Sequence, residues 1–144
     1  MRKIHLVLLC VITMNPTLAQ DTFTLYENII PNSRDALNEE ETEKHEGITI
    51  VRKISVPTMR FFPAAEHIAT GTAVIIFPGG SYAMNSLSHE GYDIAAKFNE
   101  IGVTAFVVKY RLPSDATMIN KQIGPLQDAQ QAIKIVREQS QKFK

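Results

Sequence analysis

The sequence predicts an α/β fold in which two parallel strands are joined through a helix. Two unbroken apolar runs, 73–77 and 103–110, are typical of strands that are covered on both faces. A helical pattern of apolar residues lies between them. A strand, a helix and a second strand over about forty residues form a βαβ unit, whose crossover we expect to be right-handed.

Length and charge restrict the classes of protein that fit. The chain has 144 residues, of which 44% are hydrophobic and 21% are charged, as expected for one globular domain. Fifteen basic residues balance fifteen acidic ones, so no basic face for nucleic acid is implied. The acidic run at 39–41 is interpreted as part of a solvated loop.

The N-terminus predicts a secretory signal peptide over residues 1–19. Arg2 and Lys3 precede an apolar run at 4–14, and a small-residue site predicts cleavage after Ala19. The run is too short for a permanent membrane anchor. We therefore expect residues 20–144 to form part of one exported domain, periplasmic or extracellular, with no membrane attachment after cleavage.

Cys10 is the only cysteine and lies inside this signal. Its removal leaves no disulfide in the mature part. A lipoprotein with acylated Cys10 is the alternative, which Leu9 and the better site at Ala19 disfavour.

The first half of the domain predicts strands near an edge. Residues 21–28 suggest a short edge strand, and the polar stretch 31–47 predicts a surface loop. Residues 48–62 are rich in β-branched and aromatic side chains. Pro57 lies among them and marks either an edge strand or a break between two short strands.

The helix after the first apolar strand has a clear start and stop. Ser88 is a plausible N-cap, and Gly102 ends the pattern. Between them Ile94, Phe98 and Ile101 are predicted to form a buried stripe.

A second helix is predicted to begin at Pro125, after a loop over 114–124, because proline suits a first helical turn. One apolar face carries the helical period through Leu126, Ala129, Ile133 and Val136. Basic residues towards its end, Lys134, Arg137 and Lys142, oppose the negative end of the helix dipole.

The turn Pro78-Gly79-Gly80-Ser81 is the candidate for chemistry. Two glycines after a parallel strand allow peptide N–H groups to converge on one point, where they can stabilise a developing oxyanion. No residue spacing supports a metal site or a bound cofactor, since His45, His67 and His89 are irregularly placed.

Four segments resemble a known family. These are FPGGSY (77–82), SHEGYDIA (88–95), VTAFVVKYRLP (103–113) and PLQDAQQAIKIVR (125–137). They resemble the N-terminal half of secreted esterases of the α/β-hydrolase superfamily, in the acetylxylan-esterase-like and xylan-associated lipase-like branch. The order of elements agrees with the first half of that fold, which has two N-terminal edge strands, then β-α-β-α with parallel strands in an incomplete sheet.

The resemblance implies roles for residues of the turn. The oxyanion donors would be the amides of Gly80 and Ser81, with Pro78 and Gly79 forming the turn. Serine at 81 replaces a glycine of the family, which is tolerable if its φ is negative. Tyr82, His89, Glu90 and Arg111 would lie near the rim, Arg111 as a structural arginine.

The resemblance also implies a serine nucleophile in G-x-S-x-G, followed by an acid and a histidine, which we expect beyond Lys144. Residues 79–83 match the G-x-S-x-G pattern, but the next helical pattern does not begin directly after them. His89 is the only histidine downstream, and no acidic residue lies between Ser81 and His89. The expected protein is an esterase acting on acetyl or other short acyl esters of plant polysaccharides, with this chain alone inactive. A small ester or an acylated carbohydrate would be the substrate of the full-length protein.

Two alternatives differ in class. One is a non-catalytic exported α/β binding module that ends naturally at residue 144 and holds an anion at Gly79-Gly80. The other, a nucleotide-binding protein, is disfavoured because the turn lacks G-x-G-x-x-G and no P-loop lysine follows.

Overall fold

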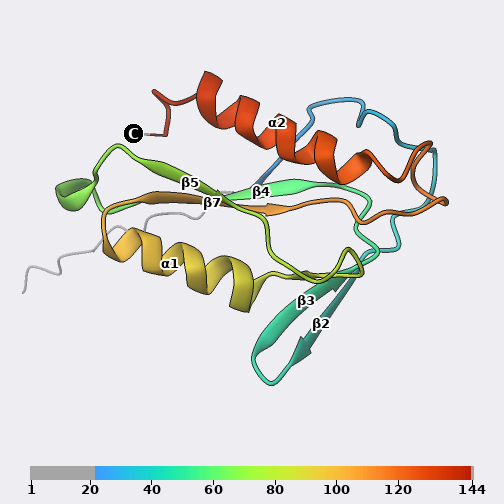
Figure 1. Ribbon diagram of the computed structural model, residues 1–144, viewed down its shortest axis with the longest axis horizontal. Helices are drawn as coiled ribbons and strands as arrows, with labels where there is room; N and C mark the ends of the chain where they lie inside the picture. The colour runs from blue at the N-terminus through green and yellow to red at the C-terminus, as the bar shows by residue number, and fades with distance from the viewer. Residues whose placement is uncertain (1–21, 144) are drawn as a thin grey trace, which may run out of the picture.

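The structure, a computed structural model, describes residues 22–143 (Figure 1). Its main sheet has four strands in the spatial order β1-β4-β7-β5. Their bounds are Thr22–Thr24 for β1, Thr58–Phe62 for β4, Thr104–Lys109 for β7 and Ala73–Ile76 for β5. The outer strand β1 confirms the predicted edge strand, and Pro57 lies in the break that precedes β4.

The predicted βαβ unit is present. β5 and β7 are parallel, with Ala73 opposite Thr104 and Ile76 opposite Val107. Helix α1 (Asp93–Glu100) connects them, and helix α2 (Gly124–Glu138) follows β7. Figure 1 shows α1 and α2 on opposite faces of the sheet. A short 3-10 helix, Glu66–Ile68, precedes β5. None of the helices in residues 22–143 is both long and apolar enough to cross a membrane.

The core is centred on β7. Ala105, Phe106, Val107 and Val108 are all buried, because β7 lies between two strands and beneath a helix on each face. This confirms the interpretation of 103–110 as a strand that is covered on both faces.

The loop predicted over 31–47 is wrong in part. Residues Glu41–His45 form strand β2, which pairs with β3 (Ile48–Arg52) in a hairpin. Both turn residues have positive φ, 49° at Glu46 and 83° at Gly47, as a type I′ turn requires. Every side chain of β2 is exposed, so the strand carries no hydrophobic period. The two-residue strand β6 (Asn85–Ser86) completes this second sheet.

The start of α1 also differs from the prediction. A π-helical turn, Ser88–Tyr92, precedes the helix, and the Ser88 side chain does not cap it. The Ser88 hydroxyl instead accepts the N–H of Thr49 at 2.7 Å. Gly102 ends the helix as predicted: its φ is 76°, and the next N–H, from Val103, reaches the carbonyl of Phe98 at 3.0 Å.

The predicted apolar stripes are wrong in part: Phe98 and Val136 pack against the core as predicted, but other members are exposed. In α1, Ile94 and Ile101 are 42% and 65% exposed, whereas Ala95 is buried. In α2, Leu126 and Ile133 are exposed, and the buried positions are Gly124, Asp128, Ala132 and Ile135. Small residues therefore occupy most of the buried positions of the two helices. Pro125 lies in the first turn of α2, as predicted.

One side of β5 has no strand partner among the described residues, since β5 pairs with β7 alone. Its residues are consequently half-buried or exposed rather than covered on both faces as predicted. The predicted signal peptide over 1–19, including Cys10, lies outside the described residues.

Candidate functional site

The glycine turn follows β5 at its carboxyl end, next to β7. Pro78 is buried and holds the chain against the sheet, while Ser81 and Tyr82 are exposed. Three successive residues have positive φ: 140° at Gly80, 53° at Ser81 and 58° at Tyr82. This run turns the backbone sharply away from the strand.

Close contacts surround both glycines of the turn. A Cβ atom at Gly79 would overlap the carboxylate of Glu90, and one at Gly80 would overlap the carbonyl oxygen of Met84. Since the neighbour at Gly80 is backbone, no side-chain rotation relieves that overlap. A side chain at Gly79, by contrast, can be accommodated only if the carboxylate of Glu90 moves away.

Ser81 does not meet the condition set from the sequence. Its φ of 53° lies in the left-handed region, not at a negative value. The same holds for Tyr82, a bulky residue that rarely adopts this conformation. Strained backbone of this kind is concentrated at functional sites, where surrounding structure holds it in place.

Some peptide N–H groups of the turn donate hydrogen bonds within the protein, and others do not. Gly79 donates to Oε2 of Glu90 at 2.9 Å. The N–H groups of Ala83 and Met84 both reach the carbonyl of Gly80, at 2.9 and 3.3 Å. Gly80 and Ser81 donate to no acceptor within residues 22–143. Two adjacent donors are therefore available to an external oxygen.

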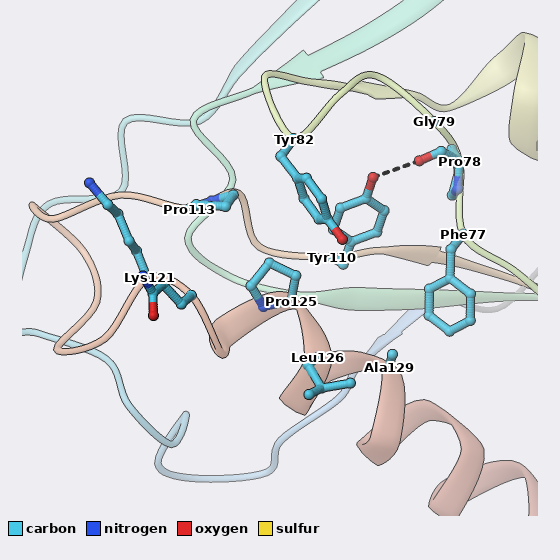
Figure 2. A pocket seen from close by; sticks show the side chains of 11 residues that line it. Phe77, Pro78, Gly79, Tyr82, Tyr110, Pro113, Lys121, Pro125, Leu126 and Ala129 are labelled. Carbon is cyan, nitrogen blue, oxygen red and sulfur yellow. Dashed lines mark hydrogen bonds between the residues drawn. The ribbon is translucent and has the colours of Figure 1, made fainter.

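Tyr110, the last residue of the apolar run 103–110, supports the turn, a role that the sequence did not predict. Its hydroxyl donates to the carbonyl of Pro78 at 2.8 Å (Figure 2). Its N–H donates to Oδ1 of the buried Asn85 at 3.1 Å. A tyrosine at the end of a buried apolar strand was the available signal, since its hydroxyl needs a partner. Burial, followed by the neighbouring Tyr82 and Glu90, raises the pKa of Tyr110, so the phenol remains a donor.

Tyr82 stands beside Tyr110 at the mouth of a cavity. The two rings meet edge to face with centroids 6.2 Å apart. The cavity, of about 680 Å³, also runs past Phe77 and towards Leu126 and Ala129 of α2 (Figure 2). A second cavity of about 560 Å³ lies along the loop after β7 and is also lined by Tyr82. Tyr82 thus lines both cavities.

The other residues predicted at the rim take different positions. His89 is exposed on the π-helical turn, with Nδ1 4.0 Å from Oδ2 of Asp93. Arg111 is not on the rim, because its side chain is fully buried. Its guanidinium binds Asp128 of α2 and the carbonyl of Pro31, so the polar groups of three segments meet beneath the surface.

Asp128 also accepts the hydroxyl of Tyr26 at 3.1 Å. Burial, followed by the Asp128 carboxylate, raises the pKa of the Tyr26 phenol far above its ordinary value. Asp128 therefore has a structural partner on each side and lies too far along α2 to compensate the start of the helix dipole.

The arrangement offers charge stabilisation without a nucleophile. Within residues 22–143, no hydrogen bond joins the Ser81 hydroxyl to a histidine or a carboxylate. An unactivated serine hydroxyl is a weak nucleophile. What the site provides is a pair of free amides at Gly80 and Ser81, in a turn whose residues Gly79 and Tyr82 line an apolar cavity.

The chain is similar in sequence to two known hydrolases. The chain is 41% identical over 69 residues to an acetylxylan esterase from Xylanibacter ruminicola, and 37% identical over 73 residues to endo-1,4-beta-xylanase B from Butyrivibrio fibrisolvens. These matches cover 48% and 49% of this chain, but only 13% and 11% of the two relatives. No family model matches the chain.

A solved structure is similar over most of the fold. It is an acetyl ester-xyloside bifunctional hydrolase from Caldicellulosiruptor lactoaceticus, with 28% sequence identity and a TM-score of 0.64. The match covers 86% of this chain and 38% of that protein. The chain therefore spans well under half the length of the proteins it resembles.

Proposed function

This chain is an acetylxylan-esterase-like α/β-hydrolase, and from that premise we propose that it supplies the oxyanion-hole turn of a carboxylic-ester hydrolase. The observation that carries the proposal is the pair of free N–H groups at Gly80 and Ser81. They follow the carboxyl end of a parallel strand, and their neighbours Gly79 and Tyr82 line a cavity large enough for an ester. The substrates are acetyl or other short acyl esters, in particular those of plant polysaccharides.

The chemistry follows from where charge develops. When a nucleophile attacks an ester, the carbonyl oxygen becomes an oxyanion in the tetrahedral intermediate. Preorganised N–H donors stabilise that charge more than they stabilise the uncharged ester. Removing one such donor typically lowers kcat by about 10²–10³-fold. Tyr110 and Pro78 keep the turn in place, so that little reorganisation is needed during the reaction.

The nucleophile, the acid and the histidine base belong, in this proposal, to a segment beyond Lys144. Two features of the structure support such a segment. The free side of β5 can accept a further parallel strand, and the cavity beside Phe77 lies at the end of β5 where the turn after that strand would emerge. We also propose that the protein is exported after cleavage at Ala19.

The first experiment uses the reading frame that contains this chain. A strand followed by G-x-S-x-G within a few tens of codons after Lys144 is expected, whereas a stop codon favours the non-catalytic binding module. The full reading frame is then assayed for acetate release from acetylated xylan and from p-nitrophenyl acetate.

The donor at Ser81 is tested directly in the full-length enzyme. Replacing residue 81 by its α-hydroxy acid exchanges the N–H for an oxygen, and we expect kcat to fall by about 10²-fold. Ser81→Ala is the matched control, because it keeps the N–H and loses only the hydroxyl. If the α-hydroxy acid variant retains the kcat of the Ser81→Ala variant, the oxyanion role of this amide is wrong.

The 144-residue chain by itself should show no ester hydrolysis. Purified chain that hydrolyses p-nitrophenyl acetate, and loses this activity on Ser81→Ala, would identify Ser81 as a nucleophile and overturn the proposal.

A further inference from the structure

We propose that Glu90 is a positioning residue of the turn, whose carboxylate holds the N–H of Gly79 and so limits the free donors to Gly80 and Ser81. The inference rests on the proposed function of those two amides. Glu90 touches no reacting atom in this scheme, since its partner is a backbone group. It acts through the conformation of the turn.

Both Glu90 and Gly79 contribute to the contact between them. Oε2 of Glu90 accepts the Gly79 N–H at 2.9 Å, and any side chain at residue 79 would overlap that carboxylate. The turn therefore has glycine at the point where the carboxylate arrives. A hydrogen bond to a charged acceptor is roughly twice as strong as one between neutral groups, which suits an acceptor exposed to water.

The π-helical turn Ser88–Tyr92 explains how Glu90 reaches this position. In this turn the N–H of Tyr92 donates to the carbonyl of Leu87, five residues earlier in the chain, at 2.8 Å. Such turns contain one extra residue and often occur at functional sites. In a regular α-helix the extra residue would be absent, and the side chain at 90 would project in another direction.

The π-helical turn is itself anchored at both ends. At its start, the Ser88 hydroxyl accepts the N–H of Thr49 from β3 at 2.7 Å. Near its end, Gly91 packs so closely that an added Cβ would lie 2.8 Å from the Val107 side chain and 3.1 Å from that of Pro78. Glu90 consequently lies between two fixed residues, Ser88 and Gly91, and Gly91 packs against Pro78 of the turn that Glu90 binds.

The charge of Glu90 and its hydrogen bond have opposite effects on an anion at the turn. The negative charge repels the anion, whereas the hydrogen bond keeps the donors in position. Glu90→Gln removes the charge and keeps an acceptor. Glu90→Ala removes both. If Glu90 acts only through its charge, the two variants should affect anion binding alike. If Glu90 positions the turn, Glu90→Ala should weaken binding and Glu90→Gln should not.

The test uses the ¹⁵N-labelled 144-residue chain carrying Ala73→Lys, a substitution that limits pairing between molecules at β5. Amide exchange is measured at Gly79, and methylphosphonate, a tetrahedral anion, is titrated while the amide resonances of Gly80 and Ser81 are followed. Glu100→Gln is the matched control, because it removes the same charge at the far end of α1, where Glu100 pairs with Lys97.

In Glu90→Ala we expect Gly79 amide exchange to accelerate about ten-fold, as the loss of one hydrogen bond implies. The methylphosphonate response of Gly80 and Ser81 should weaken. In Glu90→Gln, exchange should change by less than about three-fold, and methylphosphonate should bind about three- to ten-fold more tightly. Glu100→Gln should change neither, and β7 amides should stay protected in every variant.

Two outcomes separate the inference from the proposed function. If Glu90→Ala leaves Gly79 exchange within the range of Glu100→Gln, Glu90 positions nothing and the inference fails. If Gly79 exchange accelerates but methylphosphonate shifts neither Gly80 nor Ser81 in any variant, the positioning contact stands and the oxyanion function fails.

Discussion

The guanidinium of Arg111 and the carboxylate of Asp128 form an ion pair with no solvent exposure, in which Nη2 lies 2.7 Å from Oδ1. The backbone N–H of Arg111 also donates to Oδ2 at 2.9 Å. The pair joins the chain after β7 to α2, and Nη1 extends the network to the carbonyl of Pro31 at 2.9 Å. Because Tyr110 directly precedes Arg111, this network also holds the strand end that supports the glycine turn.

Breaking this pair should destabilise the protein strongly. Asp128→Asn leaves a buried guanidinium without its counter-ion, and we expect the free energy of unfolding to fall by about 3–5 kcal/mol. Urea denaturation of the Ala73→Lys chain measures it. Asp115→Asn is the control, since Asp115 pairs with Lys121 on the surface and should cost less than about 1 kcal/mol. A cost for Asp128→Asn as small as that of the control would mean that the pair is open to water.

Relieving the strain at Ser81 should stabilise the chain. Ser81→Gly removes a Cβ from a residue with φ of 53°, a gain of about 1–2 kcal/mol that the greater freedom of glycine in the unfolded state partly offsets. We expect a net gain of about 0.5–1 kcal/mol in urea denaturation. Ala83→Gly, at a turn residue outside the positive-φ run, should destabilise instead. Equal effects of the two substitutions would refute strain at Ser81.

The buried phenols should make the fold sensitive to alkali. Folding raises the pKa of Tyr26 and Tyr110, chiefly through burial, so the unfolded chain releases these protons first as pH rises. Their contribution to stability is present below the ordinary tyrosine pKa of about 10 and is lost as pH rises through the folded values.

Absorbance at 295 nm, which follows tyrosinate, checks this directly. Tyr26→Phe and Tyr110→Phe should each remove a late-titrating phenol, and each should flatten the fall in melting temperature above about pH 10. Tyr92→Phe is the comparison on the same chain. The pKa assignment is wrong if all four tyrosines of the wild-type chain titrate together.

The free side of β5 should promote self-association. An uncovered apolar strand offers unpaired backbone groups to a second molecule. Ala73 is exposed at the start of β5, so Ala73→Lys adds a charge at the edge without removing buried surface. We expect sedimentation velocity to show less association for this variant. Ala96→Lys, an exposed site on α1, should leave association unchanged, and an equal decrease there would point to net charge rather than to the edge.

Several features follow from local chemistry and could be predicted from the sequence alone. Pro57 cannot donate to a sheet ladder, which predicts an edge strand or a break at that point, and a break does precede β4. Gly102 adopts the positive φ that ends α1. The two apolar runs indicated neighbouring parallel strands, and the glycines of the turn indicated exposed amides. Each of these depends on residues close together in the chain.

The helix faces and the hairpin could not be predicted in this way. A hydrophobic period places Leu126 and Ile133 on one side of α2, but it does not say which side meets the sheet. The buried positions of α2 are instead Gly124, which packs against Met118, together with Ala132 and Asp128, whose charge is balanced by Arg111. β2 has no buried face, so its pairing with β3 leaves no pattern in the residue types.

The sequence by itself thus determined the order β5, α1, β7, α2 and the backbone freedom of the turn. Only the tertiary structure decided which groups support that turn. Glu90 binds Gly79 across 11 residues, and Tyr110 binds Pro78 across 32. The physical reason is that a hydrogen bond depends on where two groups lie in space. A donor and an acceptor far apart in the chain meet only after β5, β7 and the π-helical turn have packed together.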